Sequence, residues 1–166
     1  MTGKNNVLAF DLATTGLDLL QDRIVAIYCK TELSEFIFTG NERLLLIRFW
    51  MLVRSKGFEK IIGFNIDHYD VLLLLIRSMK YKISICDIRD RVIDMRHVYL
   101  NGQVYNKGKL SDFEKLLGIT YPDSSYKKSD VQRLNGYCPP ELKEFLLRDV
   151  KSTWIMFEHA RASGVL

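Results

Sequence analysis

Three short segments near the start of the chain are rich in β-branched and aromatic residues and are separated by turn-forming residues. They span Val7–Leu12, Arg23–Cys29 and Glu35–Thr39. Because the connections between them are short, we expect these strands to pair as an antiparallel meander. A chain that begins in this way builds a sheet first, and its later segments must extend that sheet or pack on it.

After the meander, predicted helices alternate with predicted strands. Leu44, Ile47 and Met51 recur at helical spacing, so we expect a helix that is capped by Asn41, runs to Arg54 and packs on the sheet. The further elements expected are the strand Lys60–Phe64, the helix Asp67–Lys80, the strand Ile83–Ile88, the helix Leu110–Leu117 closed by Gly118, and a long helix set up by Pro139 and Pro140 that runs to about Ala162. This order indicates an α/β fold with a mixed sheet.

The composition is consistent with one domain. The chain has 166 residues and 48% hydrophobic content, so we expect a single domain spanning residues 1–166. The net charge of +4 is compatible with a polyanionic partner without establishing one. The three cysteines include no CxxC pair, which indicates neither a zinc site nor a disulfide framework.

The apolar runs are shorter than the roughly 20 residues of a membrane span, and no charged-then-apolar leader opens the chain. We therefore expect a cytoplasmic protein without a membrane partner.

A carboxylate, Asp11, follows the first apolar strand and precedes a threonine-glycine turn. The stretch reads Phe10-Asp11-Leu12-Ala13-Thr14-Thr15-Gly16-Leu17-Asp18. A carboxylate at the end of a strand is exposed at the edge of the sheet, which is typical of ligand sites in α/β folds. Taken alone, however, a strand-terminal aspartate more often caps a turn.

A second motif lies where the next predicted strand leads into an apolar helix. It reads Ile62-Gly63-Phe64-Asn65-Ile66-Asp67-His68-Tyr69-Asp70-Val71-Leu72-Leu73-Leu74-Leu75. Asp67 or Asp70 could simply cap the helix and favour its positive N-terminal end. The whole run is more specific than a cap requires.

A third carboxylate, Asp149, lies on the long C-terminal helix. It is the only charged member of a helical face formed by positions 142, 145, 146, 149, 150, 153 and 157. An unpaired buried charge is costly, so either a Lys or Arg side chain or a divalent cation must neutralise it. The stripe alone does not distinguish the two.

Together these motifs resemble the DEDD family of 3′–5′ exonucleases, and the second motif closely resembles that of family-B DNA polymerases and their stand-alone relatives. The segments Asp94-Met95-Arg96, Lys107-Gly108-Lys109-Leu110 and Leu116-Leu117-Gly118-Ile119 resemble the connecting region of the same exonucleases. The resemblance runs from about Val7 to Phe157. It implies a ribonuclease-H-like fold, in which helices flank a mixed five-stranded sheet.

The resemblance also implies a function and a site. Such enzymes hydrolyse phosphodiesters at the 3′ ends of single-stranded DNA or RNA with two divalent ions, Mg²⁺ or Mn²⁺. Here Asp11, Asp70 and Asp149 would hold the ions. Thr14 and Leu17 would touch the 3′-terminal nucleotide, and Asn65 would lie near it.

Two positions depart from the active pattern. Ala13 stands where the family has a glutamate, and Phe145 stands where one branch has a tyrosine, while Glu144 occupies the histidine position of another branch. Both departures remove a group that would help to activate or position the attacking water, so we expect the nuclease activity of the chain to be weak or absent. Ala13 is either a deliberate inactivating substitution or the mark of a natural pseudo-nuclease. A deliberate substitution at position 13 would not explain Phe145.

Other residues allow more than one interpretation. A catalytically silent nucleic-acid-binding or protein-binding module is the alternative function, and a structural-interaction domain with Trp50 on a partner surface is a third. The cations that could meet phosphates, or could be ordinary solvated surface, are Lys107, Lys109, Lys127, Lys128 and Arg133. Tyr105 and Tyr126 could stack bases or pack within loops. His68, His97 and His159 show no ligand spacing, and we assign them no role.

Overall fold

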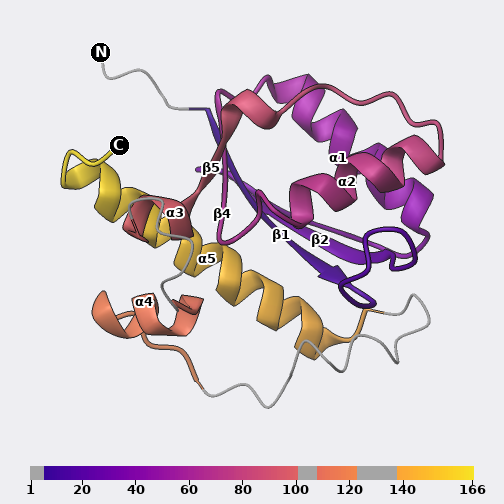
Figure 1. Ribbon diagram of the computed structural model, residues 1–166. Coiled ribbons are helices and arrows are strands. Elements are labelled where there is room, and N and C mark those ends of the chain that lie inside the picture. Colours follow the sequence, from indigo (N-terminus) through magenta and orange to yellow (C-terminus); the bar gives the residue numbers. More distant parts are fainter. Residues whose placement is uncertain (1–5, 101–107, 123–137) are drawn as a thin grey trace.

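A five-stranded sheet forms the centre of the protein in the computed structural model, which describes residues 6–100, 108–122 and 138–166 (Figure 1). The strands are β1 (Val7–Thr14), β2 (Ile24–Lys30), β3 (Glu35–Thr39), β4 (Lys60–Gly63) and β5 (Val92–Asp94), in the order β3-β2-β1-β4-β5. The first three strands form the predicted antiparallel meander, whereas β1 and β4 are parallel, as are β4 and β5. The sheet is therefore mixed.

Helices cover both faces of this sheet. They are α1 (Glu42–Lys56), α2 (Asp70–Lys80), α3 (Met95–Leu100), α4 (Leu110–Leu116) and α5 (Pro140–Ala162). In Figure 1, α1 and α2 lie on one face and α5 crosses the other, with α4 near α5. The predicted fold class, an α/β ribonuclease-H-like fold with a mixed five-stranded sheet flanked by helices, is confirmed. No helix within the described ranges is long and apolar enough to cross a membrane.

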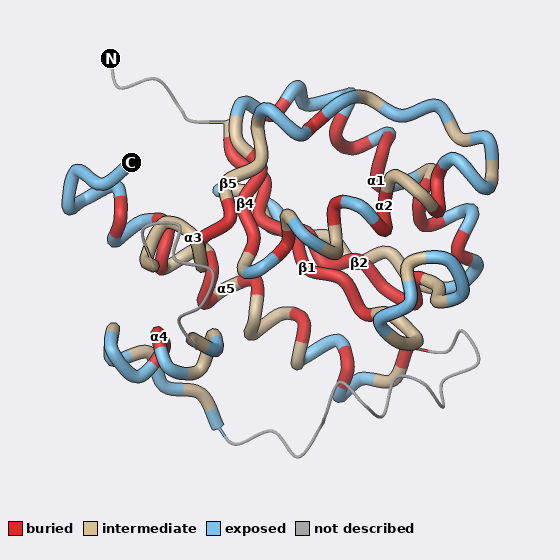
Figure 2. The backbone as a smooth tube through the Cα atoms, viewed as in Figure 1, coloured by how far each residue is buried: buried red, intermediate tan, exposed pale blue. Residues whose placement is uncertain are grey.

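Strand β1 is buried on both faces because helices pack against each of them (Figure 2). Its side chains alternate, as they must in a strand. Leu8, Phe10 and Leu12 join the core beneath α1 and α2, whereas Ala9 and Ala13 join the core beneath α5. A strand covered on both faces reads as a nearly continuous apolar run, which is what the sequence contains here.

Strand β1 also continues beyond its neighbour β4. The parallel pairing between them ends at Ala9 and Ile62, and β4 itself ends at Gly63. The chain then turns away through Asn65, which has a φ of 60°. The second half of β1 consequently lacks a strand on one side, and this leaves room for a cleft at the carboxyl ends of the two strands.

One predicted strand is wrong. Residues Ile83–Ile88 form no strand, and the fifth strand is instead Val92–Asp94, which follows a 3₁₀ turn at Arg89–Arg91. Ile88 is nevertheless completely buried. A short apolar run indicates burial, but it does not distinguish a strand from a loop that packs on the core.

The helix boundaries and faces needed smaller corrections. Helix α2 begins at Asp70, three residues later than predicted, and α3 was not predicted. In α1 the residues used to predict the helix include two exposed side chains, Leu44 and Met51, because most residues from Leu44 to Val53 are apolar and more than one face fits the spacing. Trp50 is buried and its Nε1 donates to Ser78 Oγ over 2.7 Å, so it forms no partner surface.

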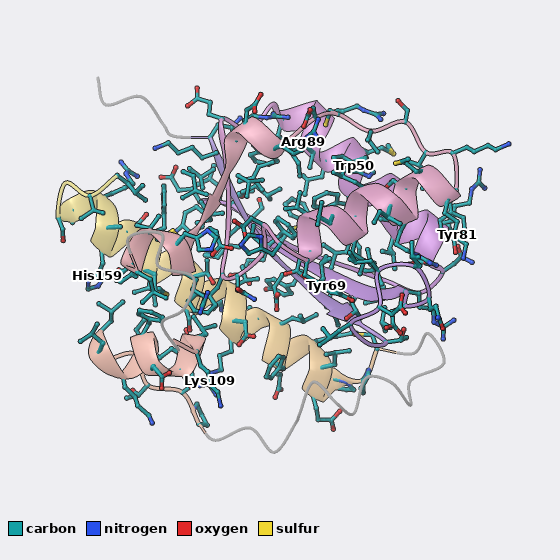
Figure 3. The ribbon with its side chains drawn as sticks, in the orientation of Figure 1. Trp50, Tyr69, Tyr81, Arg89, Lys109 and His159 are labelled. Atoms are coloured by element: carbon teal, nitrogen blue, oxygen red, sulfur yellow. The ribbon has the colours of Figure 1, made fainter. Side chains whose placement is uncertain are left out.

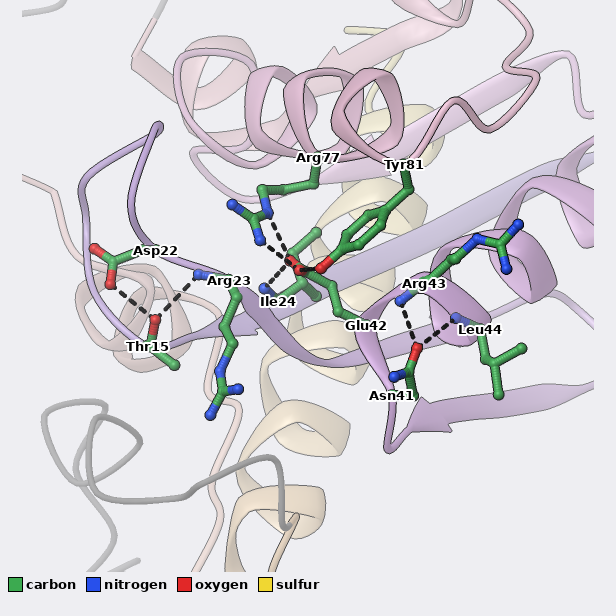
Figure 4. A network of polar contacts seen from close by, with 10 residues as sticks. All are labelled: Thr15, Asp22, Arg23, Ile24, Asn41, Glu42, Arg43, Leu44, Arg77 and Tyr81. Carbon is green, nitrogen blue, oxygen red and sulfur yellow. Dashed lines mark hydrogen bonds and ion pairs between the residues drawn. The ribbon is translucent and has the colours of Figure 1, made fainter.

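A buried ion pair joins α1, α2 and the start of β2 (Figure 4). The Glu42 carboxylate accepts hydrogen bonds from Arg77 Nε at 2.8 Å and Arg77 Nη2 at 2.5 Å. It also accepts from the Ile24 amide at 2.7 Å and the Tyr81 hydroxyl at 2.8 Å. Every acceptor site of the buried carboxylate is thus used within the protein, as a buried charge requires.

Candidate functional site

A cleft of about 950 Å³ lies at the carboxyl ends of β1 and β4, between the loop before α2 and helix α5. All eight residues singled out as candidate site residues line it: Asp11, Ala13, Thr14, Leu17, Asn65, Asp70, Phe145 and Asp149. They come from β1 and its following turn, from the β4–α2 connection and the first residue of α2, and from α5. Segments that are far apart in the sequence therefore meet in one cavity.

The β1 side of the cleft carries Asp11 and Ala13. Asp11 is not at the end of the strand, as the sequence indicated, because β1 continues to Thr14 and Asp11 pairs in register with Tyr28. It reaches the cleft because β4 has already ended. Only 8% of Asp11 and 4% of Ala13 is exposed. The two residues are two positions apart in a strand, so their side chains point to the same face.

The turn after β1 is held by hydrogen bonds to its own side chains. The Thr14 hydroxyl donates to the Gly16 carbonyl over 2.8 Å, and the Thr15 hydroxyl donates to Asp22 Oδ1 over 2.8 Å (Figure 4). A Cβ atom at Gly16 would collide with the Asp22 carboxylate and displace it from its hydrogen bonds with the Thr15 hydroxyl and the Asp18 amide, so glycine suits this position. Leu17 projects from the turn with 83% of its surface exposed.

The loop before α2 is fixed by a residue that the sequence did not single out as part of the site. Asp94, which is buried at the end of β5, accepts hydrogen bonds from the amides of Asn65 at 2.8 Å, Asp67 at 3.3 Å and Arg96 at 2.9 Å. This anchorage holds Asn65 in its left-handed conformation and sets where the helix starts. Asp67 does not cap α2, because the helix begins at Asp70 and Asp67 belongs to the preceding loop.

Tyr69 connects this loop to the turn after β1. Its side chain lies between α2 and the end of β1 (Figure 3), and its hydroxyl donates to the Gly16 carbonyl over 2.5 Å. Burial raises the pKa of Tyr69 above its ordinary value of 10.0, so the hydroxyl remains protonated and able to donate at neutral pH. The sequence identified an aromatic residue here, but it contained no signal for this contact.

Helix α5 supplies the opposite wall. Leu142, Leu146 and Val150 are buried, as the predicted stripe requires, whereas Phe145 and Asp149 are partly exposed and line the cleft. Asp149 thus lies at the margin of the stripe and faces the cavity, and is not enclosed in the core.

A buried carboxylate of α4 supports the α5 wall of the cleft. Glu114 of α4 accepts from Arg148 Nη2 and from the Ser152 hydroxyl, each over 2.6 Å. These contacts tie α4 to α5 beside Asp149, and the hydrogen bond to Glu114 raises the pKa of Arg148. Arg148 and Glu114 both line the cleft, and the positive charge of Arg148 is paired there with the Glu114 carboxylate.

Two other cations also line the cleft. They are Arg96, whose Nε donates to the Gly108 carbonyl over 3.2 Å, and Lys109, which stands near the start of α4 (Figure 3). Lys109 was among the predicted phosphate contacts. The other residues predicted to meet phosphates or bases lie outside the described residues: Lys107, Lys127, Lys128, Arg133, Tyr105 and Tyr126.

The sequence is similar to that of an archaeal protein. The uncharacterized protein MJ0365 of Methanocaldococcus jannaschii is 35% identical over 162 residues, which cover 89% of this chain and 91% of that protein. The chain belongs to the family of this archaeal protein. No family model matches the sequence.

The fold is similar to that of part of a much larger protein. The structure of the family B DNA polymerase from the hyperthermophilic archaeon Pyrobaculum calidifontis aligns with 93% of this chain at a TM-score of 0.79 and 19% sequence identity. The alignment covers 24% of the polymerase chain. At this identity the likeness establishes the fold, which is nuclease-like and of the ribonuclease-H type, and it does not establish an activity.

Proposed function

We propose that this protein is a stand-alone exonuclease-type protein that binds the 3′ ends of single-stranded DNA or RNA, and in which Ala13 weakens hydrolysis. One observation carries the proposal. Asp11, Asp70 and Asp149, chosen from three separate sequence motifs, line the same cleft although they come from three different elements. Carboxylates that converge on one cavity are typical of divalent-cation sites, because their oxygen atoms are the ligands that such ions prefer.

The donors in the cleft fit Mg²⁺ or Mn²⁺. Hard oxygen ligands suit these ions, and the three carboxylates are of that kind. When bound at such a site, these ions activate water and stabilise the leaving oxygen of a phosphodiester. The protein contributes a rigid frame, since Asp94 and Tyr69 fix the loop that leads into α2, whose first residue is Asp70.

Substrate contacts follow from the same frame. The turn carrying Thr14 and Leu17 forms one rim of the cleft, and an exposed leucine there offers an apolar surface for the terminal base. Lys109 and Arg96 line the cleft with positive charge that favours a phosphate backbone. A single strand, whose bases are accessible, suits such a cavity better than a duplex does.

Position 13 is where we expect the activity to be limited. Ala13 lines the cleft and its side chain points to the same face as that of Asp11. A glutamate there would add a fourth candidate metal ligand beside Asp11, Asp70 and Asp149. Its absence weakens the attraction for a second dication, and loss of a positioned catalytic group commonly lowers the rate by about 10² to 10⁴.

A second candidate function rests on another observation. Phe145 also lines the cleft, so two positions that carry reactive groups in the resembled enzymes are inert here. This combination favours a catalytically silent module that binds nucleic acid or a protein partner with the same surface. Such a module would bind single strands in a salt-sensitive way, with or without chelator.

The decisive experiment restores the charge at position 13. We expect Ala13→Glu to release nucleotides from the 3′ end of labelled single strands in Mg²⁺ or Mn²⁺ about 10²- to 10⁴-fold faster than the unaltered protein. The matched control is Ala13→Gln, which has the same size without the charge and should gain nothing. Adding Asp11→Asn to Ala13→Glu should abolish the gain.

The same experiment separates the two candidates. If Ala13→Glu folds but releases no nucleotides, even when combined with Phe145→Tyr, the nuclease proposal fails. If, in addition, single-strand binding is unaffected by chelator, the silent-module alternative replaces it.

A further inference from the structure

Two histidines to which the sequence assigned no role lie next to an aspartate. Asp67 and His68 belong to the loop before α2, and His97 belongs to α3. His97 Nδ1 is 2.9 Å from Asp67 Oδ2, and His68 Nε2 is 3.6 Å from Asp67 Oδ1. The two imidazole rings meet edge to face, with 5.2 Å between their centroids. None of the three residues lines the carboxylate cleft.

The polar atoms of this cluster are incompletely satisfied by the protein. Asp67 Oδ1 and His97 Nε2 are both buried and neither has a hydrogen-bond partner. A buried polar atom without a partner costs free energy, and each such atom in a native protein calls for an explanation. A bound cation is one, because carboxylate oxygens and neutral imidazole nitrogens are both metal ligands.

The electrostatic surroundings also favour a cation. The buried Asp94 carboxylate lies next to Asp67 and accepts a hydrogen bond of 3.3 Å from the Asp67 amide. Two carboxylates in a partly dehydrated place gain from a dication beside them.

We propose that Asp67, His68 and His97 bind a transition-metal dication, for which Zn²⁺ is the representative, at a site separate from the carboxylate cleft. One ligand atom from each residue can be chosen so that all three lie within 4.8 Å of one another. Zinc binds imidazole nitrogen and carboxylate oxygen at about 2.0–2.2 Å, so the three donors must move closer together to share one ion. Two imidazoles with one carboxylate select zinc, cobalt or nickel over Mg²⁺, which prefers oxygen ligands alone.

The position of the site gives it a structural consequence. His97 lies on α3, whereas Asp67 and His68 lie in the loop just before Asp70, the first residue of α2. A metal ion would therefore tie α3 to the loop that leads into α2. Three protein ligands also leave coordination positions for water, as in open zinc sites.

Cobalt and zinc titrations of the full chain test the proposal. After treatment with chelator, and with Mg²⁺ in excess to occupy the carboxylate cleft, we expect the protein to bind one equivalent of Co²⁺ with the visible absorption of a nitrogen- and oxygen-ligated ion, and Zn²⁺ should displace it. His68→Ala and His97→Ala should each weaken Zn²⁺ binding, measured by calorimetry, by at least about tenfold. His68 has 64% of its side chain exposed, so its replacement should leave the fold intact.

Two controls define what would overturn the proposal. His159→Ala, which removes an exposed histidine from α5, should leave Zn²⁺ affinity unchanged. Asp11→Asn should also leave it unchanged, and this separates the site from the carboxylate cleft. If His68→Ala and His97→Ala bind Zn²⁺ as tightly as the unaltered protein, or if that protein binds no Co²⁺, the cluster is only a set of hydrogen-bonded and ion-paired side chains.

Discussion

The hydroxyl of Tyr69 donates a hydrogen bond of 2.5 Å to the carbonyl of Gly16, and this contact joins the turn after β1 to the loop before α2. Both segments line the candidate cleft. The Gly16 carbonyl also accepts from Thr14, so it keeps one partner if Tyr69 is altered. The bond therefore matters more for the relative position of the two segments than for satisfying a buried group.

Tyr69→Phe tests this coupling. The ring stays and only the hydroxyl is lost, so we expect the free energy of unfolding to fall by about 0.5–1.5 kcal/mol, the usual net contribution of one hydrogen bond. Urea unfolding measures this loss. In the Ala13→Glu background, we also expect slower nucleotide release, because Asp70 is held less firmly. Equal stability and equal activity would show that the contact does not position the loop.

Asp94→Asn should disturb the same loop from the other side. Asp94 Oδ1 accepts from the amides of Asn65 and Arg96, and Oδ2 accepts from the amide of Asp67. Asparagine has one acceptor oxygen, so its NH₂ group would oppose an amide donor. We expect the free energy of unfolding to fall by about 1–3 kcal/mol. Urea unfolding again measures it, and Asp90→Asn, on an exposed turn, should change stability by less than about 0.5 kcal/mol. Equal effects from both variants would contradict the anchoring role.

The parts of the site that sequence reasoning located are those with a local signature. Asp11 was identified because a turn follows an apolar strand, and Asp149 because it interrupts an apolar helical stripe. Helical and strand periods report burial reliably over a few turns or alternations. β3 accordingly has the predicted bounds, Glu35–Thr39, and the meander pairs as expected.

The missed features depend on contacts between distant segments. Asp94 anchors an amide 29 positions away, and His97 meets Asp67 from another element. No spacing within one segment reports such a meeting, because it is decided by how β5 and α3 are placed on the sheet. The short strand Val92–Asp94 was missed for a similar reason: three residues contain too few alternations to form a pattern.

Glu42→Gln should strongly destabilise the protein. The side chains of Glu42 and Arg77 are only 5% and 4% exposed, so the variant leaves a buried guanidinium without its counter-charge. Breaking a buried pair in this way costs about 3–5 kcal/mol, and unfolding in urea measures the loss. Glu42→Gln combined with Arg77→Met should cost less than the sum of the single changes. Glu59→Gln, at an exposed position, is the matched control. Additive costs would show that the two side chains do not act as a pair.

Glu35→Gln should make stability depend less on pH. The Tyr28 hydroxyl donates to Glu35 Oε2 over 2.6 Å, and Lys30 and Lys151 lie 3.4 Å and 3.7 Å from Oε1. The hydrogen bond from Tyr28, followed by the lysine charges, lowers the pKa of Glu35 below its ordinary value of 4.5. The stabilisation is therefore fully present above pH 4.5 and is lost as the pH falls through the lower folded pKa.

Because solvent screens this partly exposed carboxylate, we expect a stability difference of no more than about 1 kcal/mol at neutral pH. Urea unfolding at several pH values should show that difference shrinking as acid is added, while Glu32→Gln, an exposed neighbour, shows none. A difference that stayed constant down to strongly acidic pH would contradict the assignment of the lowered pKa to these contacts.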